Sequence, residues 1–282
     1  RLYVSESTMR RYLNTASVTL RKYHVEWILQ PVNLSGSEAN IRKFFKDFYY
    51  ESDVTPHTLL PPKEPIALVS DVLSEMPAEL VNTGVSPSDF YDSLYIAIKR
   101  YQLGKTVQIP QSLAKIIETH EAFAVMNDLA PKIEALYRVR LPQQEIMWLY
   151  LVTVMKRTLT EPEKEHQFVA SFGLYPELEE LSQRFVQEWG ISFQEPQRVK
   201  TMIHAFFLSK KINEQLAPVL NHLLTEVKNE AQKHRSAAYQ RNLAFMKQHQ
   251  AILGIKQEYL VDICAALTLY SEAIRELYAQ KV

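Results

Sequence analysis

The sequence predicts a mostly helical protein, with a small unit of helix and hairpin at the amino end and paired helical domains behind it. Six glycines in 282 residues leave few flexible or left-handed positions, which favours helices over a turn-rich β fold. Apolar residues recur at helical spacing along most of the chain beyond residue 65. Between residues 53 and 65, four prolines break every regular element and predict a linker.

The segment 4–14 has the pattern of a helix with one exposed polar face. Ser5 can cap the first free N–H groups, while Met9, Tyr12 and Leu13 supply an inward apolar face. Hydroxyl, amide and guanidinium groups on the opposite face suit phosphate oxygens and base edges in a DNA major groove. An ordinary amphipathic helix with a solvated basic face would show the same pattern. With the basic pair that follows the helix, the predicted DNA-contacting residues are Ser5, Ser7, Thr8, Arg10, Arg11, Asn14, Arg21 and Lys22.

Residues 21–34 change to β-branched and aromatic types punctuated by Pro31 and Asn33, which predicts a short hairpin. A basic helix followed at once by a two-stranded ribbon is the order of a winged helix-turn-helix, in which the ribbon lies along the DNA backbone. Residues 1–50 carry eight Lys/Arg and four Asp/Glu, a net charge of +4 in a chain that has 32 of each sign. Since the remainder carries −4, the head is the part expected to meet nucleic acid.

The remaining elements follow from local signals. Ser37 begins a helix that runs to residue 49 and connects the head to the body. We therefore expect a head over residues 1–52, a linker over 53–65 and helical domains over 66–162 and 163–282. Within the two helical domains, the periodicity predicts helices over residues 66–79, 87–103, 110–127, 129–138, 142–158, 175–189, 196–213, 215–231, 235–249 and 255–279.

The body contains what looks like the same helical unit twice. An apolar helix that ends in a basic pair recurs with Ser93 and His204 at equivalent positions, 111 residues apart. A second helix recurs with Glu145 and Glu258 at equivalent positions, 113 residues apart. Two matches at nearly one spacing predict a duplicated domain.

The sequence carries no pattern of an enzyme or a membrane protein. Cys264 lies alone in an apolar run and is expected to be buried in a helix, and one cysteine forms no internal disulfide, which fits a reducing cytoplasm. No apolar stretch approaches the roughly 20 residues of a membrane span. The Gly-Lys-Thr at 104–106 ends like a P-loop, but Lys99 replaces its first glycine. The zinc-protease pattern that starts at His120 has Ala124 in place of its second histidine, so we expect no enzyme, metal or cofactor.

The head and the paired helical units resemble the Mga/AtxA-type transcriptional (virulence) regulators of Gram-positive bacteria. The resemblance lies in Val-Ser-Glu-Ser-Thr-Met-Arg-Arg-Tyr-Leu-Asn at 4–14, the ribbon, Asn-Ile-Arg-Lys-Phe-Phe at 40–45 and the paired units, and it covers almost the whole chain. It implies a partial winged helix-turn-helix followed by two tandem PTS regulation domains, in a cytoplasmic activator that binds double-stranded DNA. Such regulators usually begin with further DNA-binding helices and often end in an EIIB-like domain, so we expect a fragment that lacks both.

In that family, the regulation domains receive phosphate on histidines from the phosphocarrier HPr or an EIIB protein. The resemblance places Ser93 at the first such position of the first domain, so this domain is expected to be unphosphorylated or to use His120 with a different geometry. In the second domain, His204 falls on the first position, and Thr268 stands about where the later histidine would be. His204 is therefore the phosphorylation candidate and His120 a weaker one, with a purely structural histidine as the alternative for both.

Two other functions fit the same sequence. RNA-binding antiterminators also carry paired regulation domains, but with a small β-rich head in place of the helix predicted over 5–23. A non-catalytic, all-helical interaction protein would have a basic head that is only a solvated face, and it would show no steep loss of DNA affinity with salt. For the regulator, we expect a homodimer that forms through exposed aromatic residues of the second helical unit, because most DNA sites have two-fold symmetry.

Overall fold

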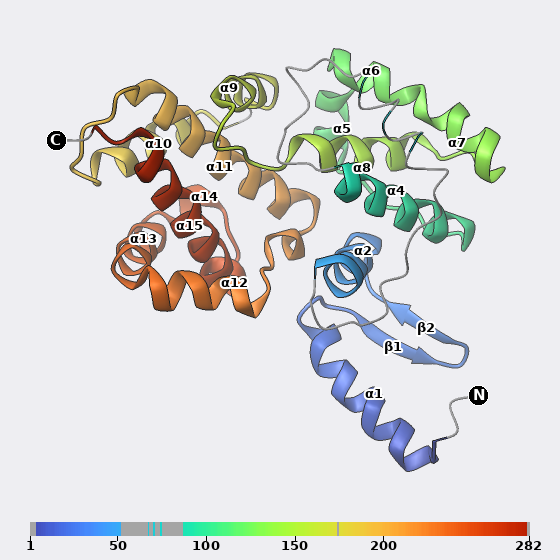
Figure 1. The fold of residues 1–282 in the computed structure, drawn as a ribbon. Helices are drawn as coiled ribbons and strands as arrows, with labels where there is room; N and C mark the ends of the chain where they lie inside the picture. Colours follow the sequence, from blue (N-terminus) through green and yellow to red (C-terminus); the bar gives the residue numbers. More distant parts are fainter. Residues whose placement is uncertain are drawn as a thin grey trace.

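A computed structural model describes residues 4–51, 67, 70, 74, 87–173 and 175–280 of the chain. This part is mostly helical, with one two-stranded sheet in the head (Figure 1). The head packs on two groups of helices, and one hydrophobic core runs through all three, from Leu20 in the head to Ile274 near the carboxyl end. The predicted fold class, a helix-turn-helix-like head on a helical body, is confirmed.

The first helix of the head, α1 (Glu6–Arg21), begins where the sequence predicts. Ser5 is its N-cap, and the Ser5 Oγ accepts a hydrogen bond from Thr8 N at 3.2 Å. Figure 1 shows that α1 projects away from the body beside the ribbon. The helix therefore buries only Leu20, and the prediction that Tyr12 faces inward is wrong, because its side chain is 54% exposed.

The predicted hairpin is confirmed. Strands β1 (Glu26–Leu29) and β2 (Val32–Ser35) pair in antiparallel register, with Trp27 opposite Leu34. The two side chains of this pair lie against the core, whereas Leu29 and Val32 at the tip of the ribbon are exposed. The ribbon thus has one face on the protein and an apolar tip in solvent.

Helix α2 (Glu38–Lys46) connects the head to the body. Ser37 caps it by accepting a hydrogen bond from the backbone N–H of the third residue of the helix, and the last turn continues into a π-helical turn, η1 (Asp47–Glu51). Its inner face buries Ile41 together with the charged side chain of Arg42. A buried arginine requires anionic partners, which α2 finds in the body.

The first group of helices packs around α4 (Pro87–Gln102) and α8 (Gln143–Val154), and α4 also lies against α2. The predicted helix 110–127 is wrong, because the chain forms two helices with a break at residues 118–120. There, Thr119 Oγ1 donates to the Ile116 carbonyl at 2.7 Å, and His120 has an extended backbone that starts the next helix. In chain order, the group comprises α4 (Pro87–Gln102), α5 (Gln111–Ile117), α6 (Glu121–Asn127), α7 (Leu129–Tyr137) and α8 (Gln143–Val154).

The second group is built around the long helix α11, against which α9, α10 and α15 pack. The sequence prediction missed α9, although a proline and two glutamates mark its first turn. In chain order, the group comprises α9 (Pro162–Ser171), α10 (Glu177–Gln187), α11 (Pro196–Leu216), η2 (Pro218–Asn221), α12 (Thr225–Asn229), η3 (Glu230–His234), α13 (Ser236–Gln248), α14 (Gln250–Leu253), η4 (Gln257–Tyr259) and α15 (Leu260–Tyr278).

The predicted helix over 215–231 is also wrong. Pro218 has no backbone N–H, and Ala217 before it is extended, with φ of −166° and ψ of 112°. Helix α11 therefore runs on to Leu216 and ends there, and short 3₁₀, α and π turns follow in place of one long helix.

The last predicted helix begins later than expected. The pattern over 255–279 becomes α15 only from Leu260, because Lys256 has an extended backbone and the next three residues form the 3₁₀ turn η4. The predicted linker at 53–65 and most of the predicted helix at 66–79 lie outside the described residues.

The two groups of helices share one hydrogen-bonding arrangement. Glu145 is the third residue of α8, and its Oε1 accepts a hydrogen bond from Val107 N, after α4, at 3.0 Å. Asp262 is the third residue of α15, and its Oδ1 accepts one from Leu223 N, after α11, at 3.1 Å. The structural counterpart of Glu145 is thus Asp262, four positions beyond the Glu258 that the sequence comparison paired with it.

Candidate nucleic-acid interface and phosphorylation sites

The predicted DNA-contacting residues lie along α1 and directly after it, and all of them except the half-buried Thr8 are exposed. Arg10 is 75% exposed and lies 2.7 Å from the carboxylate of Glu6, one turn earlier. An exposed pair of this kind contributes only about 0.3–0.5 kcal/mol, so the guanidinium is free to exchange its partner for a phosphate. Arg11 lies over the ring of Tyr12, with 5.8 Å from Cζ to the ring centroid. The helix thus presents an open face of hydroxyl, amide and guanidinium groups.

The ribbon adds no positive charge to this face. Its only charged side chain is Glu26, and its tip exposes the apolar Leu29 and Val32. The cationic side chains next to the ribbon are Arg21, whose Nε donates to a backbone carbonyl in α1 at 3.2 Å, and Lys22. The cationic side chains that a phosphate backbone could contact therefore lie on α1 and at its carboxyl end, and not on the strands.

Three of the cations that make the head basic are instead largely buried and paired with carboxylates. The side chain of Arg42 is 2% exposed, Lys43 Nζ lies 2.7 Å from Asp47, and Lys46 Nζ lies 3.7 Å from Asp89. The net charge of residues 1–50 therefore overstates the cationic surface. Within the described residues of the head, this surface is confined to α1 and residues 21–22.

Arg42 belongs to a buried ionic network that fixes α2 to the first group of helices. Its guanidinium donates to both carboxylate oxygens of Glu145, at 2.6 and 2.9 Å, and to Glu38 at 2.9 Å. Arg100 of α4 donates to the same Glu38 carboxylate at 2.9 and 2.8 Å. Burial opposes ionisation of Glu38, but the hydrogen bonds and charges of the two arginines outweigh it and lower the pKa of this carboxyl. The network holds the head in one orientation.

The head also touches the second group of helices. His24 Nε2 lies 3.0 Å from a carboxylate oxygen of Glu258, and the ring of Tyr23 packs edge-on against His222 at 4.8 Å between centroids. Burial lowers the pKa of His222, so this ring is neutral at physiological pH. The head is thus bonded to both groups of helices.

His204, the predicted phosphorylation residue, lies half-buried in the middle of α11. Burial lowers its pKa, the nearby Lys200 acts in the same direction, and Glu179 opposes it. The imidazole makes no hydrogen bond with the part of the chain that the structure describes. A neutral and unbonded imidazole is the form that attacks a phosphoryl group.

His120 is held on both of its ring nitrogens. Its Nε2 lies 3.2 Å from the Ser171 carbonyl, which can only accept, so Nδ1 accepts from the hydroxyl of Tyr150 at 2.8 Å. The ring also packs edge-on against Phe172, with 4.7 Å between centroids. Burial lowers the pKa of His120, which keeps it neutral. This arrangement favours the structural role for His120.

The other positions that the family resemblance marks are buried. Ser93 Oγ donates to the Asp89 carbonyl at 3.0 Å, and Thr268 Oγ1 donates to the Cys264 carbonyl at 2.7 Å. Cys264 is a buried helical residue, as predicted, and burial raises the pKa of its thiol to about 12. Among the described residues, no three His, Cys, Asp or Glu side chains are placed to hold a metal ion.

Comparison with known families assigns two parts of this architecture. The Mga helix-turn-helix domain matches residues 1–49, and the PRD domain matches residues 67–153. The chain is a PRD-containing regulator of the Mga type. A comparison with curated proteins gave no match.

As an Mga-type regulator, the protein binds DNA and regulates transcription, and its two matched domains indicate a regulatory, non-catalytic protein. The Mga match covers α1, the ribbon and α2, and the PRD match ends within α8. Neither match reaches the second group of helices. Among the helices that the structure describes, none is both long and apolar enough to cross a bilayer.

Proposed function

We propose that this regulator couples DNA binding by α1 to phosphorylation of its helical body by the phosphotransferase system. The observation that carries the proposal is the open polar and cationic face of α1, on a head that is bonded to both groups of helices. Guanidinium groups would contact phosphates and base edges, while hydroxyl and amide groups fix the register. The DNA-binding residues proposed are Ser5, Ser7, Thr8, Arg10, Arg11, Asn14, Arg21 and Lys22.

The DNA part is tested by salt-titrated binding of the full-length protein to a duplex of about 30 base pairs. The double variant Arg10→Ala with Arg11→Ala is expected to weaken binding and to reduce the salt slope by about 2, because two phosphate contacts are lost. Arg184→Ala is the matched control, since Arg184 is an exposed arginine that pairs with a glutamate one turn earlier, far from the head. Unchanged affinity and slope in the double variant would remove α1 from the interface.

The proposal includes a second PRD over residues 163–282. The support is the repeated arrangement in which a carboxylate at the third residue of a helix, Glu145 or Asp262, accepts a backbone hydrogen bond from the chain after the preceding core helix. Both carboxylates also bind a cation, Arg42 in the first case and Lys228, at 2.9 Å, in the second. Two such coincidences are expected of a duplicated domain.

Phosphorylation is proposed at His204, with HPr or an EIIB protein as donor. A phosphoryl group adds about −1.5 to −2 charge, which would repel Glu179 and attract Lys200, two residues that now pair at 3.0 Å. Phosphorylation would thus break an ion pair between α10 and α11. It is detected by intact mass and phosphosite mapping of full-length protein from cells grown with and without a phosphotransferase sugar.

The same proposal makes a genetic prediction. His204→Asp, which mimics the added charge, and His204→Ala are expected to change reporter activity in opposite directions. His166→Ala, at an exposed histidine of α9, is the control and is expected to behave like the wild type. Identical activities of the two His204 variants would exclude this residue.

Homodimerisation stays in the proposal because most DNA sites have two-fold symmetry. The exposed aromatic residues expected in the second group are not found: in its described part, the exposed large apolar side chains are Ile252, Val261 and Leu277. Light scattering across micromolar concentrations tests the oligomeric state, and a monomer throughout would refute the dimer.

The alternative of an RNA-binding antiterminator loses its main support in the head. A β-rich head would have favoured it, whereas the head is a helix, a hairpin and a helix and matches the Mga helix-turn-helix domain. The same match disfavours an all-helical interaction protein with no nucleic-acid partner.

A further inference from the structure

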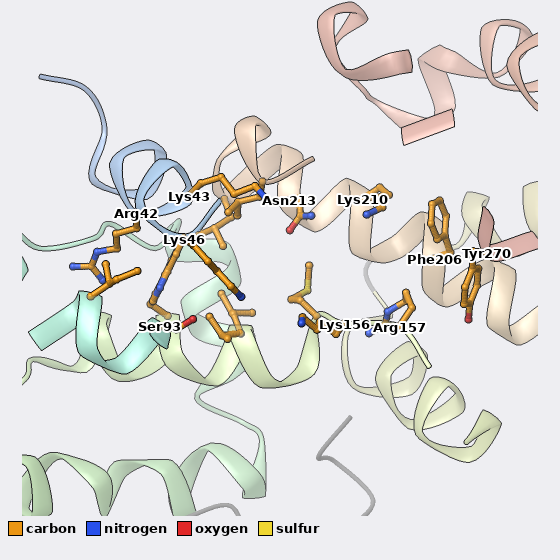
Figure 2. A pocket seen from close by; sticks show the side chains of 17 residues that line it. Arg42, Lys43, Lys46, Ser93, Lys156, Arg157, Phe206, Lys210, Asn213 and Tyr270 are labelled. Atoms are coloured by element: carbon orange, nitrogen blue, oxygen red, sulfur yellow. The ribbon is translucent and has the colours of Figure 1, made fainter. Parts of the chain in front are cut away.

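A cavity of about 440 Å³ lies where the head meets both groups of helices (Figure 2). Its walls come from α2, α4, the end of α8, α11, η2 and α15. This volume is in the range of sites for small molecules, which often form where domains meet. His204 does not line the cavity, so the cavity is a separate site from the proposed phosphorylation site.

The described lining combines many cations with no carboxylate. Figure 2 shows Lys43 and Lys46 on α2, Lys156 and Arg157 after α8, and Lys210 on α11. Most of these cations pair with carboxylates outside the lining; Lys46 and Lys156, for example, share Asp89. The full set of cationic lining residues is Arg42, Lys43, Lys46, Lys156, Arg157 and Lys210.

Lys210 differs from the other five, because its Nζ makes no hydrogen bond or ion pair with any described residue. The amino group lies 5.1 Å from the ring centroid of Phe206, and its charged neighbours, Arg157 and Lys43, are both cations. Burial, reinforced by these two charges, lowers the pKa of Lys210 to about 8. At neutral pH, an ammonium group is thus held in a cavity where no carboxylate of the described residues balances it.

Arg157 adds a second cation to the lining of the same cavity. The side chain of Arg157 is only 8% exposed, and its Nη1 donates to Glu165 at 2.6 Å, but its Nε–H has no hydrogen-bond partner in the described part of the chain. A buried donor without an acceptor costs about 1–3 kcal/mol. Lys210, with the positive charge of Arg157 beside it, forms an incomplete site for an oxyanion.

Most of the remaining lining is apolar, although Ser93, Asn213 and Tyr270 also belong to it. Trp148 and Leu151 of α8, Leu216 of α11, Leu220 of η2 and the ring of Phe206 face the same space. An inorganic anion would leave this surface without contact, whereas a ligand with a carbon skeleton would cover it.

We propose that the cavity binds a small phosphomonoester, with its phosphate beside Lys210 and Arg157 and its carbon part against Phe206 and Leu216. A phosphate oxygen can accept a charge-assisted hydrogen bond from Lys210, and the positive charge of the Arg157 guanidinium adds electrostatic attraction. The contacts named lie on α11 and after α8, in a cavity whose other walls include parts of the head and of α4.

The test is isothermal titration calorimetry of the whole chain with phenyl phosphate, in phosphate-free buffer at pH 7. Wild-type protein is expected to bind it, to bind inorganic phosphate more weakly and to show no binding of phenol. Lys210→Met is expected to weaken the affinity for phenyl phosphate at least about tenfold, since a hydrogen bond to a charged group is lost. Lys115→Met, at an exposed lysine of α5, is the matched control and is expected to bind like the wild type.

Four outcomes would overturn the proposal. Wild-type protein that does not bind phenyl phosphate at millimolar concentration has no such site. Equal affinity of the wild type and a Lys210→Met variant shown to be folded by its urea unfolding transition excludes Lys210. If inorganic phosphate binds as tightly as phenyl phosphate, the apolar lining does not contribute to binding, and the proposal of an organic ligand is wrong. If a short DNA duplex displaces phenyl phosphate, the cations that line the cavity bind DNA rather than a small phosphomonoester.

Discussion

Replacing Lys210 with methionine is expected to stabilise the protein at neutral pH, although it removes a charge from a residue that contacts Phe206. The drop in the pKa of Lys210 from an ordinary value of 10.5 to about 8 corresponds to about 3 kcal/mol that the folded state loses by holding the ammonium. Methionine keeps an unbranched apolar stem, but it gives up a cation–π contact of about 0.5–2 kcal/mol. The expected net gain in the free energy of unfolding at pH 7 is about 1–3 kcal/mol.

The gain has a pH dependence whose sign follows from the depressed pKa. Below pH 8, both the folded and the unfolded wild-type chain hold the proton on Lys210, so the full destabilisation is present. As the pH rises from about 8 to 10.5, the unfolded chain holds more protons than the folded one, and the wild type recovers stability. The contribution of this charge at pH 9.5 is expected to be about two fifths of that at pH 6.

The measurement is urea unfolding, followed by tryptophan fluorescence at pH 6, 7 and 9.5 in phosphate-free buffer. Lys115→Met is the control, because this exposed lysine of α5 is expected to change stability by less than about 0.5 kcal/mol at every pH. A Lys210→Met variant that is less stable than the wild type at pH 7, or whose gain is independent of pH, would show that Lys210 is not a half-buried ammonium that lacks an anion among the described residues.

Two further predictions concern buried polar groups in the first group of helices. Glu145→Gln is expected to lower the free energy of unfolding by about 3 kcal/mol, because it leaves a buried arginine without its main anion, whereas Glu118→Gln at an exposed position is expected to have little effect; equal urea midpoints would contradict this. Tyr150→Phe is expected to raise the pKa of His120 by removing a hydroxyl that donates to the neutral imidazole, and an unchanged NMR titration of His120 would show that burial alone sets this pKa.

Elements of the head were predictable because their signals are local. Ser5 and Ser37 each lie three residues before the N–H that they cap, and the hairpin is marked by β-branched residues around Pro31. The break between α5 and α6 was not predictable in the same way. It depends on His120, whose ring is bonded to Tyr150 and Ser171, 30 and 51 residues further along the chain.

The candidate site also contains residues whose position was predictable from local signals and residues whose position depends on distant parts of the chain. The sequence placed the open face of α1 correctly, but it counted Arg42 with Arg10 as equivalent positive charges. Arg42 is buried because of Glu145, which is 103 residues away, and a count of charges contains no information about such a partner. Likewise, Lys210 and Lys211 look like one basic pair, yet Lys211 pairs with Glu177 at 2.8 Å while Lys210 faces other cations.

Because α2 is fixed to α8, a small rotation of α8 would move the far end of α1 by a larger distance. With 16 residues, α1 is about 24 Å long, and it projects from a base that Arg42 and Glu145 clamp to α8. If α8 tilts by about 5°, the clamp carries the base with it and the far end of α1 moves by about 2 Å. A displacement of this size equals much of the length of a hydrogen bond, so a shift too small to disturb the packing of the body is enough to put the guanidinium groups of α1 in or out of register with a phosphate backbone.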